Sequence, residues 1–153
     1  MQFGILWPTI ALVALIFIVW ATMFWQRSVH MKKTPPSAAD FADGAAAMRY
    51  FAPVEMPANN FRNLFEAPVL YFALVPLLMI THQANHIQVI LAWSYVVLRA
   101  AHSFIHIGPK KVPLRFLLYA ASCAVLLAMW IGFAVDACHA QAVIDSVAVN
   151  ELI

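Results

Sequence analysis

Charged residues are scarce in this chain. Asp, Glu, Lys and Arg make up 10% of its 153 residues, whereas soluble domains contain about 25%. Hydrophobic residues account for 64%, and the mean hydropathy is +0.81. This composition excludes an ordinary soluble globular protein, and the apolar segments leave no room for a second, soluble domain. We therefore predict an integral membrane protein.

Cysteine is also scarce, and the two cysteines present indicate no metal site. Cys123 and Cys138 lie too far apart to form a metal-binding motif. His139 follows Cys138 directly, but one such pair is too little for zinc. We expect Cys123 to be a small packing residue within a helix. We assign no metal ligands and expect no nucleic-acid partner.

Four apolar segments occupy most of the sequence, and each is close to the roughly 20 residues that cross a hydrocarbon core. They run over about residues 4–25, 60–82, 87–107 and 114–135. The first lacks a basic leader, so we interpret it as a retained span rather than a signal peptide. Short connections make consecutive helices antiparallel neighbours. The predicted fold is all-α: one transmembrane domain over residues 1–153, built as an up-down four-helix bundle.

The longest polar connection covers residues 26–58. A Pro-Pro pair near its start breaks any helix there. Beyond that pair we expect a short helix from about residue 38 to 50, with Ser37 and Asp40 as possible caps, lying along the membrane surface.

The basic residues fall on one side of the predicted bundle. Arg99 lies in the half of its helix nearest that side, and the other eight lie in or beside the first and third connections. Those eight are Arg27, Lys32, Lys33, Arg49, Arg62, Lys110, Lys111 and Arg115. By the positive-inside rule these two loops face the cytoplasm. Both termini, the 83–86 turn and a tail over residues 136–153 are then expected outside.

Three polar residues enter the opening turns of the second span. Arg62, Asn63 and Glu66 are spaced so that their side chains share neighbouring parts of one helical surface. Ionisable groups are costly inside a bilayer and indicate a functional site with a partner group. The alternative is an ion pair that only holds helices together.

A second polar stripe lies on the third span. Arg99, His102 and His106 are spaced by three and four residues, which places them along one side of the helix. Arg115 follows in the first turn of the fourth span. Together with Arg62 and Glu66 these groups converge on the cytoplasmic end of the bundle. Guanidinium groups bind carboxylates in bidentate fashion, so the pattern predicts a pocket for an anionic ligand.

These residues resemble the signatures of the MAPEG family, the membrane-associated proteins of eicosanoid and glutathione metabolism. Residues 62–66, Arg-Asn-Leu-Phe-Glu, resemble its Arg-Asn-x-x-Glu signature in helix two. Residues 99–102, with Arg115 sixteen positions after Arg99, resemble its second signature and its helix-four arginine. The resemblance extends over all four spans, the length and the topology.

The resemblance implies a homotrimer that binds glutathione between subunits near the cytoplasmic side. Arg115 matches the residue that holds the glutathione thiolate in that family. The other residues that it implies for glutathione binding are Arg27, Arg62, Asn63, Glu66, Arg99, His102 and His106. The implied partners are membrane lipids and a hydrophobic small-molecule substrate, and the compact length resembles bacterial members of the inner membrane.

Two functions remain open at this point. The first is a glutathione-dependent transferase or peroxidase that acts on hydrophobic electrophiles entering from the bilayer. The second is a non-catalytic protein of the same fold, serving as an accessory subunit or binding lipid. Arg115 with the Arg-Asn-x-x-Glu residues favours the first. Departures from the family pattern favour the second, and they are Asn59, Asn60, His106 and Phe116.

Overall fold

A computed structural model of the chain describes residues 2–150, and every regular element in that range is helical. The elements in chain order are η1 (Gln2–Ile5), α1 (Leu6–Lys33), η2 (Ala38–Phe41), α2 (Gly44–Phe51), η3 (Ala52–Val54), α3 (Met56–Glu66), α4 (Pro68–Ile80), α5 (His86–Ile107) and α6 (Val112–Asn150), where η marks a 3₁₀ helix.

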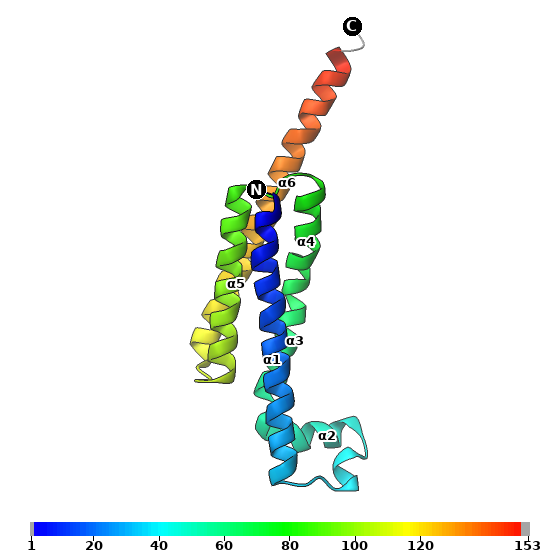
Figure 1. Cartoon of the computed structure of the whole chain (residues 1–153), viewed down its shortest axis with the longest axis vertical. Coiled ribbons are helices and arrows are strands. Elements are labelled where there is room, and N and C mark those ends of the chain that lie inside the picture. Colours follow the sequence, from blue (N-terminus) through cyan, green and yellow to red (C-terminus); the bar gives the residue numbers. More distant parts are fainter. Residues whose placement is uncertain (1, 151–153) are drawn as a thin grey trace.

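Four helical stretches run side by side and alternate in direction (Figure 1). Residues 3–33, 56–80, 86–107 and 112–146 are each long and apolar enough to cross a membrane. The two ends of the described chain lie toward the same end of the bundle, and the connections 34–55 and 108–111 lie toward the other (Figure 1). The predicted all-α, four-span architecture is confirmed.

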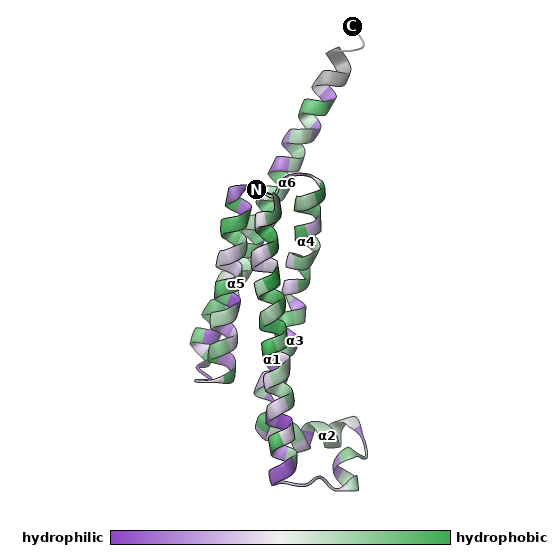
Figure 2. Cartoon of the chain, in the orientation of Figure 1, coloured by the Kyte–Doolittle hydropathy of each residue, from purple (hydrophilic) through white to green (hydrophobic). Residues whose placement is uncertain are grey.

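The core lies where α1, α4, α5 and α6 meet. It includes Leu12 of α1, Leu74 of α4, Ala92 of α5 and Met129 of α6. Many large apolar side chains instead point outward, among them Phe17 at 64% exposure. Hydrophobic residues cover the middle of the bundle, and hydrophilic residues are more frequent toward its two ends (Figure 2). Such an outward apolar band is what a helix presents to lipid.

The first helix is longer than the expected span. It continues from Trp25 to Lys33, because no helix-breaking residue occurs before the Pro-Pro pair at residues 35–36. The expected helix over residues 38–50 is divided into η2 and α2. Asp43 begins α2 by accepting a hydrogen bond from the Ala46 N–H at 2.7 Å.

The second and fourth spans also differ from expectation. The second is divided at Ala67, because Pro68 has no N–H with which to continue the ladder of α3. The fourth was expected to end near Val135, with a tail from residue 136. Instead α6 remains helical to Asn150, since neither Gly nor Pro follows Gly132, and it extends past the other helices (Figure 1).

Candidate functional site

Polar side chains fill the buried stripe of α5. Arg99 has none of its surface exposed, and His102, Ser103 and His106 are also buried. Arg99 donates a hydrogen bond from Nη2 to the main-chain carbonyl of Asn63 in α3. These groups lie on one side of α5, as their three- and four-residue spacing predicts, and that side faces the interior of the bundle.

The Arg99 guanidinium also meets α6. Its Cζ lies 5.5 Å from the centre of the Tyr119 ring, a cation–π distance. The Nε and Nη1 groups of Arg99 are buried and have no hydrogen-bond partner among residues 2–150. A buried cation with unused donors can bind a further acceptor at low cost in desolvation.

His102 is fixed by the first turns of α6. Its Nδ1 lies 3.0 Å from the main-chain carbonyl oxygen of Arg115. Its ring centre lies 5.8 Å from that of Tyr119 and 5.5 Å, edge-on, from that of His106. The orientation of the imidazole is therefore set by one hydrogen bond and two ring contacts.

A cleft of about 230 Å³ opens between these elements. Its lining residues come from α3, α5 and α6, and they are Asn63, His102, Val112, Arg115, Phe116 and Tyr119. Arg115 is half-buried, while Phe116 is 71% exposed. The cleft thus places a fixed cation and an imidazole beside aromatic surface that continues to the outside of the bundle.

Sequence reasoning missed two contributors to this region. Tyr119 lines the cleft, and its only signal was its position one turn after Arg115. Ser103 donates to the amide oxygen of the fully buried Asn60 at 3.4 Å, a weak bond between α5 and α3. Asn60 lies one turn before Asn63, and this spacing indicates that the two asparagines share one side of α3.

The comparison with protein families decides what kind of protein carries this cleft. The MAPEG family model matches residues 5–135, which include α1, α3, α4, α5 and the cleft. The chain belongs to the MAPEG family. No curated protein and no solved structure matches it. Family membership and four membrane-capable helices together identify an integral membrane protein.

Two of the residues implied for MAPEG glutathione binding lie on the protomer surface. Arg62 and Glu66 are exposed and line a separate cavity of about 490 Å³ with Ala58, Phe61 and Phe65. Glu66 makes no ion pair with any residue of the range 2–150, although it lies near enough to Arg99 for their charges to interact. The ion pair that was the alternative explanation for these residues is therefore not formed by Glu66 within the described residues.

Arg27 also stands apart from the cleft of this MAPEG chain. Its Cζ lies 4.7 Å from the ring centre of Phe51, so α2 holds the side chain against the end of α1. His30, one turn later, approaches the carbonyl oxygen of Tyr50 at 3.0 Å with its Nε2. Asn63, His102 and Arg115 thus line one cleft, with Arg99 and His106 in contact with its lining residues, whereas Arg27, Arg62 and Glu66 do not line it.

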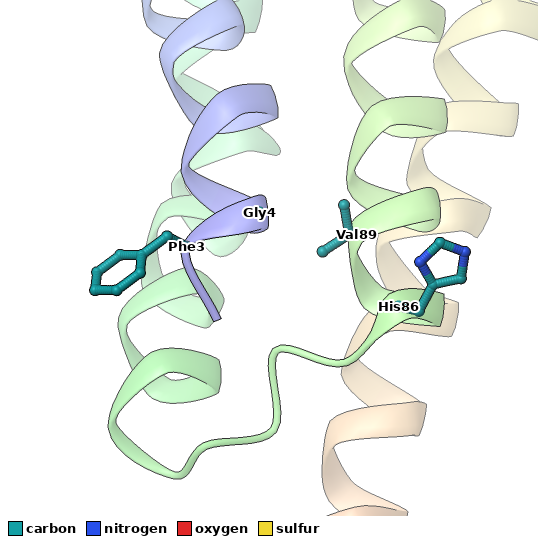
Figure 3. A pocket seen from close by; sticks show the side chains of 4 residues that line it. All are labelled: Phe3, Gly4, His86 and Val89. Carbon is teal, nitrogen blue, oxygen red and sulfur yellow. The ribbon is translucent and has the colours of Figure 1, made fainter. Parts of the chain in front are cut away.

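A third cavity lies at the opposite end of the bundle and has a different character. It is lined by Phe3, Gly4, His86 and Val89 (Figure 3). A Cβ at Gly4 would lie 3.5 Å from Val89 Cγ2, an ordinary contact distance, so η1 packs against α5 here without a requirement for glycine. His86 is its one titratable lining group, whereas the cleft beside Arg115 is lined by both an arginine and a histidine.

Proposed function

We propose that this MAPEG protein binds glutathione and joins it through its sulfur to hydrophobic electrophiles, or uses it to reduce lipid hydroperoxides, with Arg115 holding the thiolate. The observation that carries the proposal is the cleft itself. It brings the half-buried Arg115 together with His102 and with the aromatic surface of Phe116 and Tyr119.

The chemistry of a thiol requires such a cation. A free thiol has a pKa of about 8.5, so it is mostly protonated at neutral pH, while the thiolate is the nucleophile. A guanidinium beside the sulfur favours the anion and remains charged when water is excluded. The thiolate sulfur then forms a bond to the electrophilic carbon, and the bond to the leaving group breaks.

The exposed aromatic surface suits a substrate that arrives from lipid. Phe116 lies at the outer edge of the cleft on a helix that spans the membrane. An apolar electrophile concentrated in the bilayer can therefore reach the sulfur without crossing water. This agrees with a hydrophobic small molecule as the second substrate.

The remaining binding residues suit the two charged ends of the tripeptide. Arg62 and Glu66 are exposed on α3, one turn apart, and offer a cation and an anion. In a homotrimer, a neighbouring subunit covers such groups and completes the site between protomers. Arg99 and His106 are buried behind the cleft lining, where they support it.

The test is glutathione binding and turnover by the purified protein. Arg115→Ala should slow conjugation of an activated aryl chloride by about a hundredfold, the usual effect of removing a preorganised charge donor. Arg49→Ala is the matched control, because Arg49 is exposed on α2. Equal rates for the wild type and Arg115→Ala would refute the role of Arg115.

A second function is favoured by one specific observation. Arg99 is fully buried and bonded to the Asn63 carbonyl, so part of the polar cluster holds α3 and α5 together. A protein that only kept this fold, as an accessory subunit or a lipid-binding protein, would retain that bond. Absence of glutathione binding to the wild type, measured by calorimetry, would favour this second function.

A further inference from the structure

We infer that His102 is the base that removes the proton from the thiol bound beside Arg115. The inference rests on the proposed function and adds a second catalytic group to it. It follows from the tautomer of His102 and from the position of that residue in the cleft lining.

The tautomer follows from one hydrogen bond. The Arg115 carbonyl can only accept, so the Nδ1 of His102, at 3.0 Å, must be the donor. In the neutral ring this places the proton on Nδ1 and a free lone pair on Nε2. The Nε2 atom is buried and has no hydrogen-bond partner within the part of the chain that the structure describes. His102 therefore presents an unused acceptor.

The base and the anion-binding group are positioned by the same residue. The main chain of Arg115 orients the imidazole, and its side chain lines the cleft with His102. A hydrogen bond from Nδ1 to an acceptor is the usual device that fixes an imidazole for proton transfer at its other nitrogen. Movement of the first turn of α6 would displace both groups together.

Two cations, Arg99 and Arg115, lie near His102 and oppose an imidazolium, so the thiolate that forms in the same step must offset them. Four charged or titratable groups lie near His102: Arg99 and His106 on α5, and Arg115 and Tyr119 on α6. Glu66 of α3 interacts with Arg99 and Tyr119 and not with His102 itself. A proton that moves from sulfur to Nε2 leaves the net charge of the site unchanged. The new imidazolium is paired with the new thiolate in the same cleft.

Atoms and charges balance over the whole reaction. The thiol S–H bond breaks and an N–H bond forms at Nε2, which gives thiolate and imidazolium. The thiolate displaces chloride from the aryl carbon, and the imidazolium then returns its proton to solvent.

The variant His102→Asn removes the base but keeps the hydrogen bond to the Arg115 carbonyl. The asparagine amide can still donate to the Arg115 carbonyl from the Nδ1 position, but it cannot accept a proton. We expect the variant to keep the helical content and thermal stability of the wild type. Thiolate formation, followed by stopped-flow ultraviolet absorbance after mixing with glutathione, should slow by about a hundredfold.

The pH profile gives a readout that a purely structural role would not move. In the wild type the rate of thiolate formation should reach a plateau once His102 is neutral. In His102→Asn it should keep rising with pH, and added imidazole should restore part of the rate. His86→Asn, at the opposite end of α5, is the matched control and should behave as the wild type.

Calorimetry of the wild type supplies a test that needs no variant. If His102 retains the thiol proton, glutathione binding in buffers of different ionisation enthalpy should release clearly less than one proton per thiolate formed. Release of a full proton overturns the inference, as does an unchanged rate and pH profile in His102→Asn. In either case the proposed function survives if the thiolate still forms. A wild type that forms no thiolate overturns both.

Discussion

Arg99 on α5 donates from its guanidinium to the main-chain carbonyl of Asn63 in the last turn of α3. Carbonyls in the last turn of a helix lack intrahelical partners, and a cation there also interacts well with the helix dipole. Helix α3 ends immediately afterwards, at Glu66, and Ala67 separates it from α4. Arg99 therefore connects α5 to the end of α3, next to the interruption between α3 and α4.

The first prediction follows from that contact. Arg99→Met should lower the free energy of unfolding by about 2 kcal/mol, the range for a hydrogen bond to a charged group. Thermal unfolding in detergent, followed by circular dichroism, measures it. Arg49→Met, on the exposed side of α2, should change little. Arg99→Lys should recover part of the loss, because an ammonium keeps the charge without the planar fork. Equal losses of unfolding free energy in Arg49→Met and Arg99→Met would contradict the role of Arg99 in joining α5 to α3.

The second prediction concerns the α5–α6 packing. Gln88 donates from Nε2 to the Met129 carbonyl at 3.0 Å, and a Cβ at Gly132 would meet that Nε2 at 3.0 Å. Alanine gains about 1 kcal/mol over glycine in a helix, but Gly132→Ala forces Gln88 to move and strains this bond. We expect no net gain in stability.

The controls for Gly132 are available in the same chain. A Cβ at Gly44 meets nothing within 4 Å, so Gly44→Ala should raise the unfolding temperature. Adding Gln88→Ala to Gly132→Ala should relieve the contact and make the two changes non-additive. A Gly132→Ala variant that is as much stabilised as Gly44→Ala would show that Gln88 relaxes freely.

The sequence predicted the bundle well because two signals were strong. Hydropathy located four spans, and the spacing of Arg99, His102 and His106 placed them on one buried stripe. The extent of α6 could not be derived in the same way. Hydropathy falls after residue 135, but helix formation continues without a breaker, and a helix does not need to be apolar to persist.

The candidate site was predicted only in part, for a different reason. Tyr119 carries no charge and resembles a packing residue until the cleft is seen. Arg62 and Glu66 were expected in the cluster, because a charge in a span requires a partner. They lie exposed on α3, and spacing along one helix gives no information about which residues outside that helix its side chains meet.

The third prediction concerns acid sensitivity outside the membrane. The Asp40 carboxylate accepts from the Ser37 N–H at 2.8 Å and the Ser37 hydroxyl at 2.7 Å, and these bonds lower the pKa of Asp40. A lowered folded-state pKa contributes stability above the usual carboxyl value of about 4, and the contribution is lost as pH falls through the lowered pKa. The η2 turn should therefore loosen only below about pH 4.

The Ser37 amide signal in an NMR titration reports this transition. Ser37→Ala removes the hydroxyl bond but keeps the amide bond, so the midpoint should rise without disappearing. Asp40→Asn should abolish the titration. An Asp40 midpoint at or above the ordinary carboxyl range would contradict the effect of the capping bonds.

The last prediction is the orientation in the membrane. Both ends of the described chain lie at one end of the bundle, and the two basic loops lie at the other (Figure 1). The positive-inside rule then places the loops and the cleft toward the cytoplasm. Two thiols test this: the natural Cys138, exposed on the α6 extension, and an introduced Lys111→Cys, with the half-buried Cys123 changed to Ala to remove background. A membrane-impermeant maleimide should label Cys138 from outside and should reach position 111 only after permeabilisation. The reverse order would invert the orientation, and labelling of both from one side would contradict the four-span topology itself.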